Sequence, residues 1–131
     1  HLPTDFVVST SPDGSADHQV VTEIPDGTMG VDIGPASVET YGRVLATAAT
    51  VFWNGPMGIF EVPEFAAGTR GVAQAVASSP SYSVVGGGDS VAALRQLGMI
   101  DEVGHASTGG GASLEFLSGT QLPGIIALER N

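Results

Sequence analysis

Lysine and cysteine are both absent from this sequence of 131 residues. Without lysine, the chain cannot form the lysine-containing P-loop that many nucleotide-binding proteins use. Without cysteine, it can form neither disulfides nor cysteine metal sites, and it has no thiol nucleophile. Four basic residues, all of them arginine, stand against 14 acidic residues, and the formal net charge is -10. Nucleic acids and anionic membranes are held by basic surfaces, so this charge argues against both as partners.

Long apolar segments are missing as well. No run approaches the roughly 18 to 20 apolar residues that a membrane-spanning helix needs. Hydrophobic residues make up 42% of the chain and charged residues 14%, a balance that favours a folded core over disorder. The chain begins at His1 with neither a methionine nor a basic leader, so we expect it to come from the middle of a longer protein.

The first third of the sequence is predicted to be rich in loops. Phe6–Val8 is a candidate for a short strand, and Val20, Val21 and Ile24 suggest a second one. Between them, residues 9–18 are polar and contain proline and glycine, which is typical of a loop. No chemistry is indicated in this part of the chain.

From residue 35 onward, helices and strands are predicted to alternate. Pro35 can begin a helix, and apolar residues then recur at spacings of three and four. Asp89 and Ser90 are suitable N-cap residues for a later helix. In order, the predicted elements are a helix from 35 to 48, a strand at 50–53, a helix at 64–77, a strand at 82–85, a helix from about 89 to 97, a strand at 105–107 and a helix at 112–117. This alternation predicts an α/β fold with a parallel sheet covered by helices.

Each of the three predicted strands is followed by a glycine-rich loop. The loops are Asn54–Glu61, Gly86–Ser90 and Gly109–Gly111, and they hold eight of the chain's 19 glycines. In parallel sheets, ligands bind in the crevice beyond the carboxyl ends of the strands. We therefore expect the three loops to lie side by side along one sheet edge and to share one ligand.

The segment Gly86-Gly87-Gly88-Asp89-Ser90 has the residues of a phosphate-binding turn. Glycines allow a phosphate to approach the backbone, and the start of the following helix offers unpaired N–H groups. Asp89 could hold a magnesium ion, because Mg²⁺ prefers one or two carboxylates together with phosphate oxygens. The alternative is a tight strand-to-helix turn in which Asp89 only caps the helix.

The other two loops carry weaker signals. Backbone N–H groups at Gly110 and Gly111 could face a second anion or a phosphoryl group in transfer, or the glycines could simply allow close packing. Asn54 could donate to a phosphate, although Asn-Gly also occurs in hairpin turns. Glu61 could accept hydrogen bonds from a ribose, although an isolated glutamate is more often a solvated surface acid.

The same loops resemble a known family. Thr50-Val-Phe-Trp-Asn-Gly-Pro-Met-Gly-Ile-Phe-Glu61, Ser83-Val-Val-Gly-Gly-Gly-Asp-Ser90 and Ser107-Thr-Gly-Gly-Gly-Ala-Ser-Leu-Glu-Phe-Leu117 are similar to signatures of phosphoglycerate kinase. Met29-Gly-Val-Asp-Ile-Gly-Pro35 and Leu122-Pro-Gly124 match as well. The likeness runs from about Leu2 to Leu128, in order, and so is specific.

The resemblance implies a fold and a reaction. The family transfers a phosphoryl group between 1,3-bisphosphoglycerate and ADP, with Mg²⁺, in the cytoplasm. Residues 1–131 resemble the second half of its C-terminal nucleotide-binding domain, a three-layer, Rossmann-like parallel-sheet domain of which this chain would be part. The family's N-terminal substrate domain is absent from these residues, as are the lysines that contact the phosphates. The other partners would therefore be the phosphoglycerate substrate and the missing upstream segment.

The resemblance also implies roles for individual residues. It places Gly30 and Val31 at the border of the adenine with Ile59 nearby, Glu61 at the ribose and Asn54 at the outer phosphates, and it includes Pro56 among the nucleotide-binding residues. It places Gly86, Gly87, Gly88, Asp89 and Ser90 at the phosphates, with Asp89 at the metal. Gly110 and Gly111 would face the phosphoryl group in transfer.

Two other classes remain open alongside a kinase fragment. One is a nucleotide- or anion-binding module that has lost the chemistry. The other is a structural fragment that assembles through its cut interface and exposed sheet edge. As a kinase fragment, the isolated chain is expected to be inactive, because phosphoryl transfer depends on positioning and on charge neutralisation from groups outside it.

Overall fold

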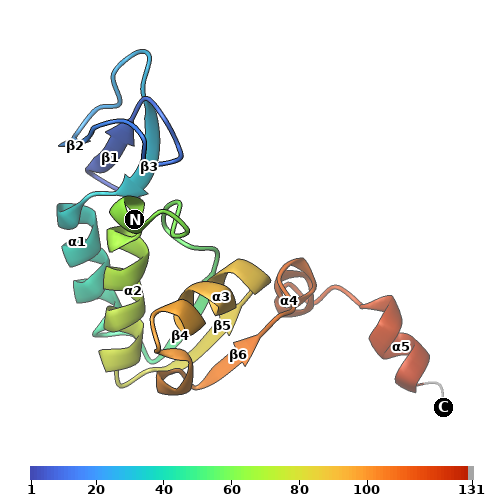
Figure 1. The fold of residues 1–131 in the computed structure, drawn as a ribbon. Helices are drawn as coiled ribbons and strands as arrows, with labels where there is room; N and C mark the ends of the chain where they lie inside the picture. The colour runs from blue at the N-terminus through green and yellow to red at the C-terminus, as the bar shows by residue number, and fades with distance from the viewer. Residues whose placement is uncertain (130–131) are drawn as a thin grey trace.

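The computed structural model describes residues 1–129 of the chain. It begins with a small antiparallel sheet of β1 (Phe6–Ser9), β2 (His18–Val21) and β3 (Met29–Ile33), in the order β2-β1-β3 (Figure 1). The first two strands confirm the sequence prediction, except that Ile24 lies outside β2. The third strand was not predicted, because Gly30 and Asp32 interrupt its apolar residues.

The second sheet is parallel, as predicted. Its strands are β4 (Thr50–Asn54), β5 (Tyr82–Gly86) and β6 (His105–Ser107), in the order β4-β5-β6. Because β4 pairs with β5 in parallel, the Asn-Gly sequence at the end of β4 is not a hairpin turn. The chain instead crosses over through a helix before it returns to the sheet.

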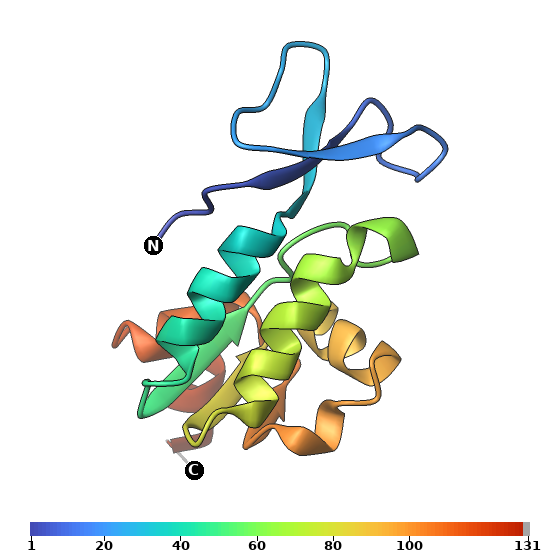
Figure 2. The same ribbon diagram turned by 90° about the vertical axis from the view of Figure 1, so that its left-hand side faces the viewer.

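Three helices pack on one face of this sheet: α1 (Pro35–Leu45), α2 (Ala67–Ser78) and α3 (Gly88–Gln96). Figure 2 shows α1 and α2 side by side in front of the strands. The core between the layers contains Ile33, Val51, Trp53, Val72, Ala73, Val76, Val85 and Leu94. Phe52 and Val84 alternate with these core residues along β4 and β5 and are only half-buried. The chain thus supplies a mixed α/β, partial Rossmann-like unit whose second sheet face is less well covered.

The N-terminus of α1 is held by a residue from before the first strand. Both carboxylate oxygens of Asp5 accept hydrogen bonds, from Ala36 N at 2.9 Å and from Ser37 N at 2.7 Å. Burial of Asp5 acts to raise its pKa, but the bonds from Ser37 and Ala36 outweigh this and the pKa is lowered. Gly34 must lack a side chain here, because a Cβ atom would overlap the Asp5 carboxylate.

The predicted helix at 64–77 is wrong at its start. The chain first forms a short 3-10 turn, η1 (Pro63–Phe65), and α2 begins after it at Ala67. Phe65 therefore does not belong to the buried face of α2. It is 0% exposed and packs with Val7 and Val31 of the antiparallel sheet.

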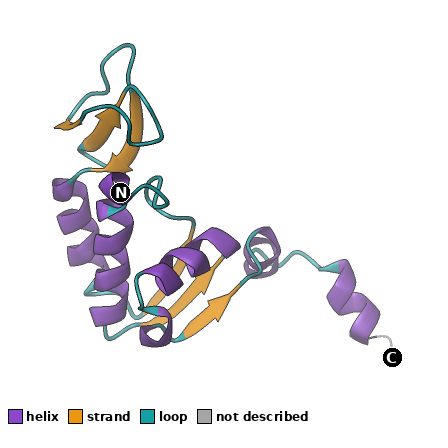
Figure 3. Cartoon of the chain, in the orientation of Figure 1, coloured by secondary structure: helices purple, strands orange, loops and turns teal. Residues whose placement is uncertain are grey.

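The C-terminal part contains a 3-10 turn, η2 (Ile100–Glu102), and the helices α4 (Gly111–Leu117) and α5 (Pro123–Glu129). The first of these helices confirms the prediction for 112–117, whereas α5 was not predicted. Figure 3 shows both beyond the edge strand β6, joined by a loop. Their large apolar side chains are exposed: Leu114, Phe116, Leu117, Ile125 and Leu128. Among residues 1–129, no helix is long and apolar enough to cross a membrane.

Candidate functional site

The three glycine-rich loops leave the parallel sheet at one edge. The register aligns Asn54 with Gly86, and Gly86 with Ser107, so the carboxyl ends of β4, β5 and β6 are neighbours. This confirms the expectation that the loops begin side by side.

Beyond the sheet edge the loops contact one another. Asn54 Nδ2 donates a hydrogen bond to the carbonyl oxygen of Gly110 at 3.3 Å, and Gly87 N donates to Ser107 O at 3.0 Å. A Cβ atom at Gly110 would lie 3.5 Å from Gly87 Cα, and one at Gly87 would lie 3.3 Å from Asn54 Oδ1. The Asn54 side chain and the backbones of Gly87 and Gly110 therefore come close together at the carboxyl ends of the strands.

Helix α3 begins differently from the prediction. Its N-cap is Gly87, at a φ of 96° that glycine adopts readily, so Asp89 and Ser90 are not cap residues but lie in the first turn. No side chain caps α3. Gly88 and Asp89 are exposed, which leaves the helix start and one carboxylate open to a phosphate-containing ligand.

Ser90 is fully buried, and its side chain fixes the neighbouring loop. Ser90 Oγ accepts a hydrogen bond from Gly55 N at 2.7 Å, while Trp53 Nε1 donates to Gly55 O at 2.7 Å. Both backbone groups of Gly55 are thus paired with side chains. The turn after Asn54 is held from two sides, with Gly55 at a φ of 94°.

The residues expected near the adenine form a second group. Ile59 N donates to Val31 O at 2.9 Å, which joins the loop after β4 to strand β3. Val31 is only 1% exposed, whereas Ile59 is half-buried and Gly30 and Glu61 are exposed. Gly30 and Ile59 therefore offer most of the accessible surface here.

The loop Asn54–Glu61, hereafter the β4 loop, connects the two groups. Asn54 lies with the phosphate-type turns, and Ile59 and Glu61 follow at its other end. Ile59 lies five positions after Asn54, so even an extended chain would place their Cα atoms at most about 18 Å apart. Pro56, half-buried, lies within this span. One elongated ligand could contact both groups.

Two residues that support the β4 loop were not among the predicted site residues. Asp32 is buried at 4% exposure; its Oδ2 accepts from Gly68 N at 2.6 Å and its Oδ1 from Ile33 N at 2.9 Å. Burial raises the pKa of Asp32, and the two hydrogen bonds offset this only in part. A single acid among the apolar residues of a strand is a sequence signal that could have marked it.

Thr69, near the start of α2, is the second such residue. Its hydroxyl oxygen accepts from Met57 N at 3.0 Å and from Gly58 N at 3.4 Å, and the residue is 1% exposed. Nothing in the sequence around Thr69 marks it, because the contact depends on how α2 is placed against the β4 loop.

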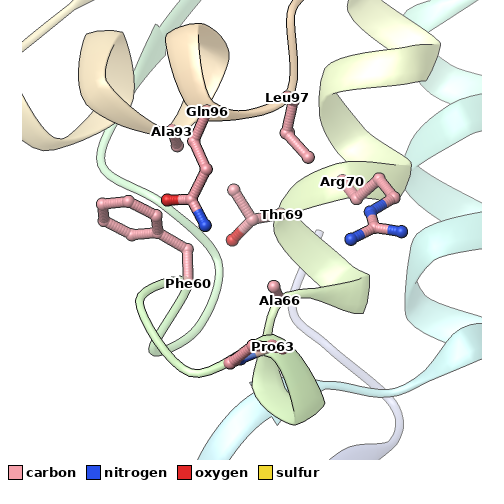
Figure 4. Close-up of a pocket in the computed structure, with 8 residues that line it drawn as sticks. All are labelled: Phe60, Pro63, Ala66, Thr69, Arg70, Ala93, Gln96 and Leu97. Atoms are coloured by element: carbon pink, nitrogen blue, oxygen red, sulfur yellow. The ribbon is translucent and has the colours of Figure 1, made fainter.

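A cavity of about 220 Å³ lies behind the β4 loop, between α2 and α3 (Figure 4). The Phe60 ring forms one side of it, and the Gln96 side chain reaches into it beside Thr69. The other lining residues are Pro63, Ala66, Arg70, Ala93 and Leu97. Phe60 thus turns to the interior between two site residues, Ile59 and Glu61.

A metal ion at this sheet edge would need ligand atoms from a bound phosphate as well as from the protein. Within residues 1–129, no cluster of three or more His, Cys, Asp or Glu side chains could hold a metal ion. Asp89 is the one carboxylate in the first turn of α3. A single carboxylate together with phosphate oxygens and water is a usual set of Mg²⁺ ligands, so the residues present fit a phosphate-bound magnesium ion.

Comparisons with known proteins identify relatives of the chain. The family model described as phosphoglycerate kinase matches residues 1–120. Phosphoglycerate kinase of Rhodococcus erythropolis is 57% identical over 135 residues, and that of Parafrankia sp. is 60% identical over 131 residues. Each match covers 98% of this chain but about a third of the relative, 34% and 33% respectively.

Solved structures agree with these matches. Phosphoglycerate kinase from Coxiella burnetii superposes with a TM-score of 0.87 at 43% identity, over 92% of this chain and 32% of the other. The enzyme from Pyrococcus horikoshii superposes with a TM-score of 0.86 at 38% identity, over 98% of this chain and 32% of the other. The motifs, the fold and the relatives therefore lead to one conclusion: the chain belongs to the phosphoglycerate kinase family of enzymes and spans about a third of the length of its curated relatives.

Proposed function

We propose that this chain is the nucleotide-binding part of a phosphoglycerate kinase that transfers a phosphoryl group between 1,3-bisphosphoglycerate and ADP. The observation that supports this most directly is the meeting of Asn54, Gly87 and Gly110 at one sheet edge. In this proposal the rest of a longer protein supplies the phosphoglycerate site and the cationic groups, and the enzyme works in the cytoplasm.

The nucleotide would lie along the β4 loop. Gly30 and Val31 border the base with Ile59 nearby, Pro56 lies within the same nucleotide-binding loop, and the exposed Glu61 carboxylate accepts hydrogen bonds from the ribose hydroxyls. Asn54 and the turn Gly86–Ser90 bind the phosphates. The helix dipole and the uncapped N–H groups at the start of α3 favour the negative charge there.

Magnesium, when bound with the nucleotide, neutralises part of the phosphate charge. Asp89 would hold it, because this carboxylate is exposed in the first turn of α3. The backbone at Gly110 and Gly111 would face the phosphoryl group in transfer. Phosphoryl transfer needs positioning and charge stabilisation more than covalent help from the protein, which suits a site made of backbone groups.

Calorimetric titration with Mg-ADP tests this site in the full protein that contains the chain. Glu61→Ala and Asp89→Ala are each expected to weaken binding by about tenfold or more, which corresponds to about 1.4 kcal/mol. Glu102→Ala and Asp101→Ala are matched controls, because both acids are exposed in η2, away from the three loops. Binding that is indifferent to Glu61 and Asp89, or equally sensitive to the controls, would contradict the proposal.

A second assay tests the dependence on the rest of the protein. The isolated chain, given Mg²⁺, ADP and 1,3-bisphosphoglycerate, should form no ATP above the blank, because it contains no lysine to neutralise phosphate charge. Measurable turnover would show that the chain alone is a complete catalyst and would refute this part of the proposal.

A further inference from the structure

We infer that Thr69 and Asp32, neither of which is a predicted ligand contact, are positioning residues that set the β4 loop for the nucleotide. The inference rests on the proposed function, since it concerns the same site. It starts from a difference in the two halves of the loop. The first half is held at Gly55 by Trp53 and Ser90, whereas the second half, which carries Ile59 and Glu61, depends on α2 and β3.

Thr69 holds the centre of the loop. One hydroxyl oxygen accepts from two consecutive N–H groups, those of Met57 and Gly58, in a buried setting. An unpaired buried N–H group costs about 1 to 3 kcal/mol, so the loop is expected to move if this acceptor is removed. Ile59 is the next residue along, and Glu61 follows two residues later.

Asp32 fixes the position of Thr69 and of the β4 loop relative to strand β3. Its carboxylate accepts from Gly68 N, in the residue directly before Thr69, and so fixes the first turn of α2 against the strand. The same carboxylate packs against the loop itself, because a Cβ atom at Gly58 would lie 2.5 Å from Asp32 Oδ1 and 2.6 Å from Val31 O. Strand, helix and loop thus meet around one buried carboxylate.

This arrangement links the base side of the site to the body of the domain. Val31, the residue before Asp32, accepts a hydrogen bond from Ile59 N. The two segments proposed to border the adenine, at Val31 and at Ile59, are therefore both joined close to Asp32. Displacement of the β4 loop would move Ile59 and Glu61 relative to Gly30 without changing any group proposed to touch the nucleotide. The expected consequence is weaker nucleotide binding with little change in the chemical step.

The test compares Thr69→Val with Thr69→Ser in the full protein that contains this chain. Valine keeps the shape of threonine but removes the acceptor, and serine keeps the acceptor. We expect Thr69→Val to raise both the Kd for Mg-ADP and the KM for the nucleotide by about tenfold, with kcat and the KM for phosphoglycerate changed by no more than about twofold. Thr69→Ser should stay within about threefold of the unchanged protein in every constant.

Ser83→Ala is the matched control for a general loss of stability. Ser83 is also buried, at 3% exposure, and its hydroxyl accepts from Gly104 N at 3.0 Å, away from the β4 loop. Thermal unfolding should show a lower Tm for both Thr69→Val and Ser83→Ala, but only the former should weaken nucleotide binding. Equal effects of the two variants on nucleotide affinity, or an unchanged affinity in Thr69→Val, would overturn the inference.

Asp32→Asn gives a second, independent variant. The amide keeps one acceptor but presents an N–H₂ group to either Gly68 N or Ile33 N, so one of the two bonds is lost. Asp32→Asn should raise the KM for the nucleotide with little change in kcat, as expected for Thr69→Val. A fall in kcat without a rise in the nucleotide KM would count against the inference. Failure of the proposed function can be told apart from failure of this inference. If the proposed function fails, Glu61→Ala leaves Mg-ADP binding unchanged. If only the positioning role fails, Glu61→Ala weakens Mg-ADP binding but Thr69→Val does not.

Discussion

The loops after β4 and after β6 border the same sheet edge, but they are held in different ways. The β4 loop is supported by buried side chains of three other elements: Thr69 of α2 and Ser90 of α3 accept hydrogen bonds from its N–H groups, and the Asp32 carboxylate of β3 packs against Gly58. The loop after β6 is held by its own residues and by the adjacent loops: Gly109 N donates to Ser107 Oγ, Ser113 Oγ donates to Gly109 O, and Asn54 Nδ2 donates to Gly110 O. One side of the site is built into the core, and the other is built locally.

The difference extends to the elements that follow each loop. After the β4 loop, η1 and α2 bury Phe65, Val72 and Val76. After the β6 loop, α4 leaves Phe116 and Leu117 59% and 61% exposed. Under the proposed function, this difference would place these residues on the nucleotide side of a larger cleft. The base and ribose side would be preformed, whereas the phosphoryl side would depend on further contacts.

The largest expected contrast is between two phenylalanines, one on each side. In this chain Phe65→Ala should lower the free energy of unfolding by about 3 to 5 kcal/mol, because Phe65 is completely buried against Val7 and Val31. Phe116→Ala should change it by less than about 0.5 kcal/mol, because the ring is largely exposed. Urea unfolding of both variants measures the contrast, and similar losses would show that α4 packs as firmly as η1.

A smaller contrast is expected between two glycines. Gly58→Ala places a methyl group against Asp32 Oδ1 and Val31 O, and we expect a loss of about 1 to 3 kcal/mol. Gly111→Ala meets no atom within 4 Å and begins α4, so its effect should stay within about 0.5 kcal/mol. Equal free energies of unfolding in the two variants would contradict the difference in anchoring.

The smallest expected effect is a pH dependence that belongs to the β4 side alone. Burial raises the pKa of Asp32, so the folded chain binds this proton more tightly than the unfolded chain. The stabilising contribution of that proton is complete below the ordinary aspartate pKa near 4 and is lost as pH rises through the folded pKa. From about pH 4 upward, the free energy of unfolding should fall more steeply with pH in the unchanged chain than in Asp32→Asn. Parallel curves for the two proteins would show that Asp32 does not have a raised pKa in the folded chain.

Much of the fold could be predicted from the residues alone. The strands β4, β5 and β6 and the helices between them follow from short apolar runs and from apolar spacings of three and four. The phosphate-type turns follow from glycine directly after a strand. Strand β3 could not be predicted, because glycine and a buried acid break its apolar pattern. The start of α2 was misplaced, since Phe65 has the right spacing for that helix yet packs on the other sheet.

The candidate site divides in the same way. The sequence by itself determined the three loops and their placement along one edge, because parallel strands place their carboxyl ends together whatever the details of packing. Only the tertiary structure decided that Ser90 anchors Gly55 from the interior, that Gly87 rather than Asp89 caps α3, and that Asp32 and Thr69 hold the β4 loop. Those contacts join residues 11 to 36 positions apart, and no local pattern encodes which buried hydroxyl or carboxylate will meet which N–H group.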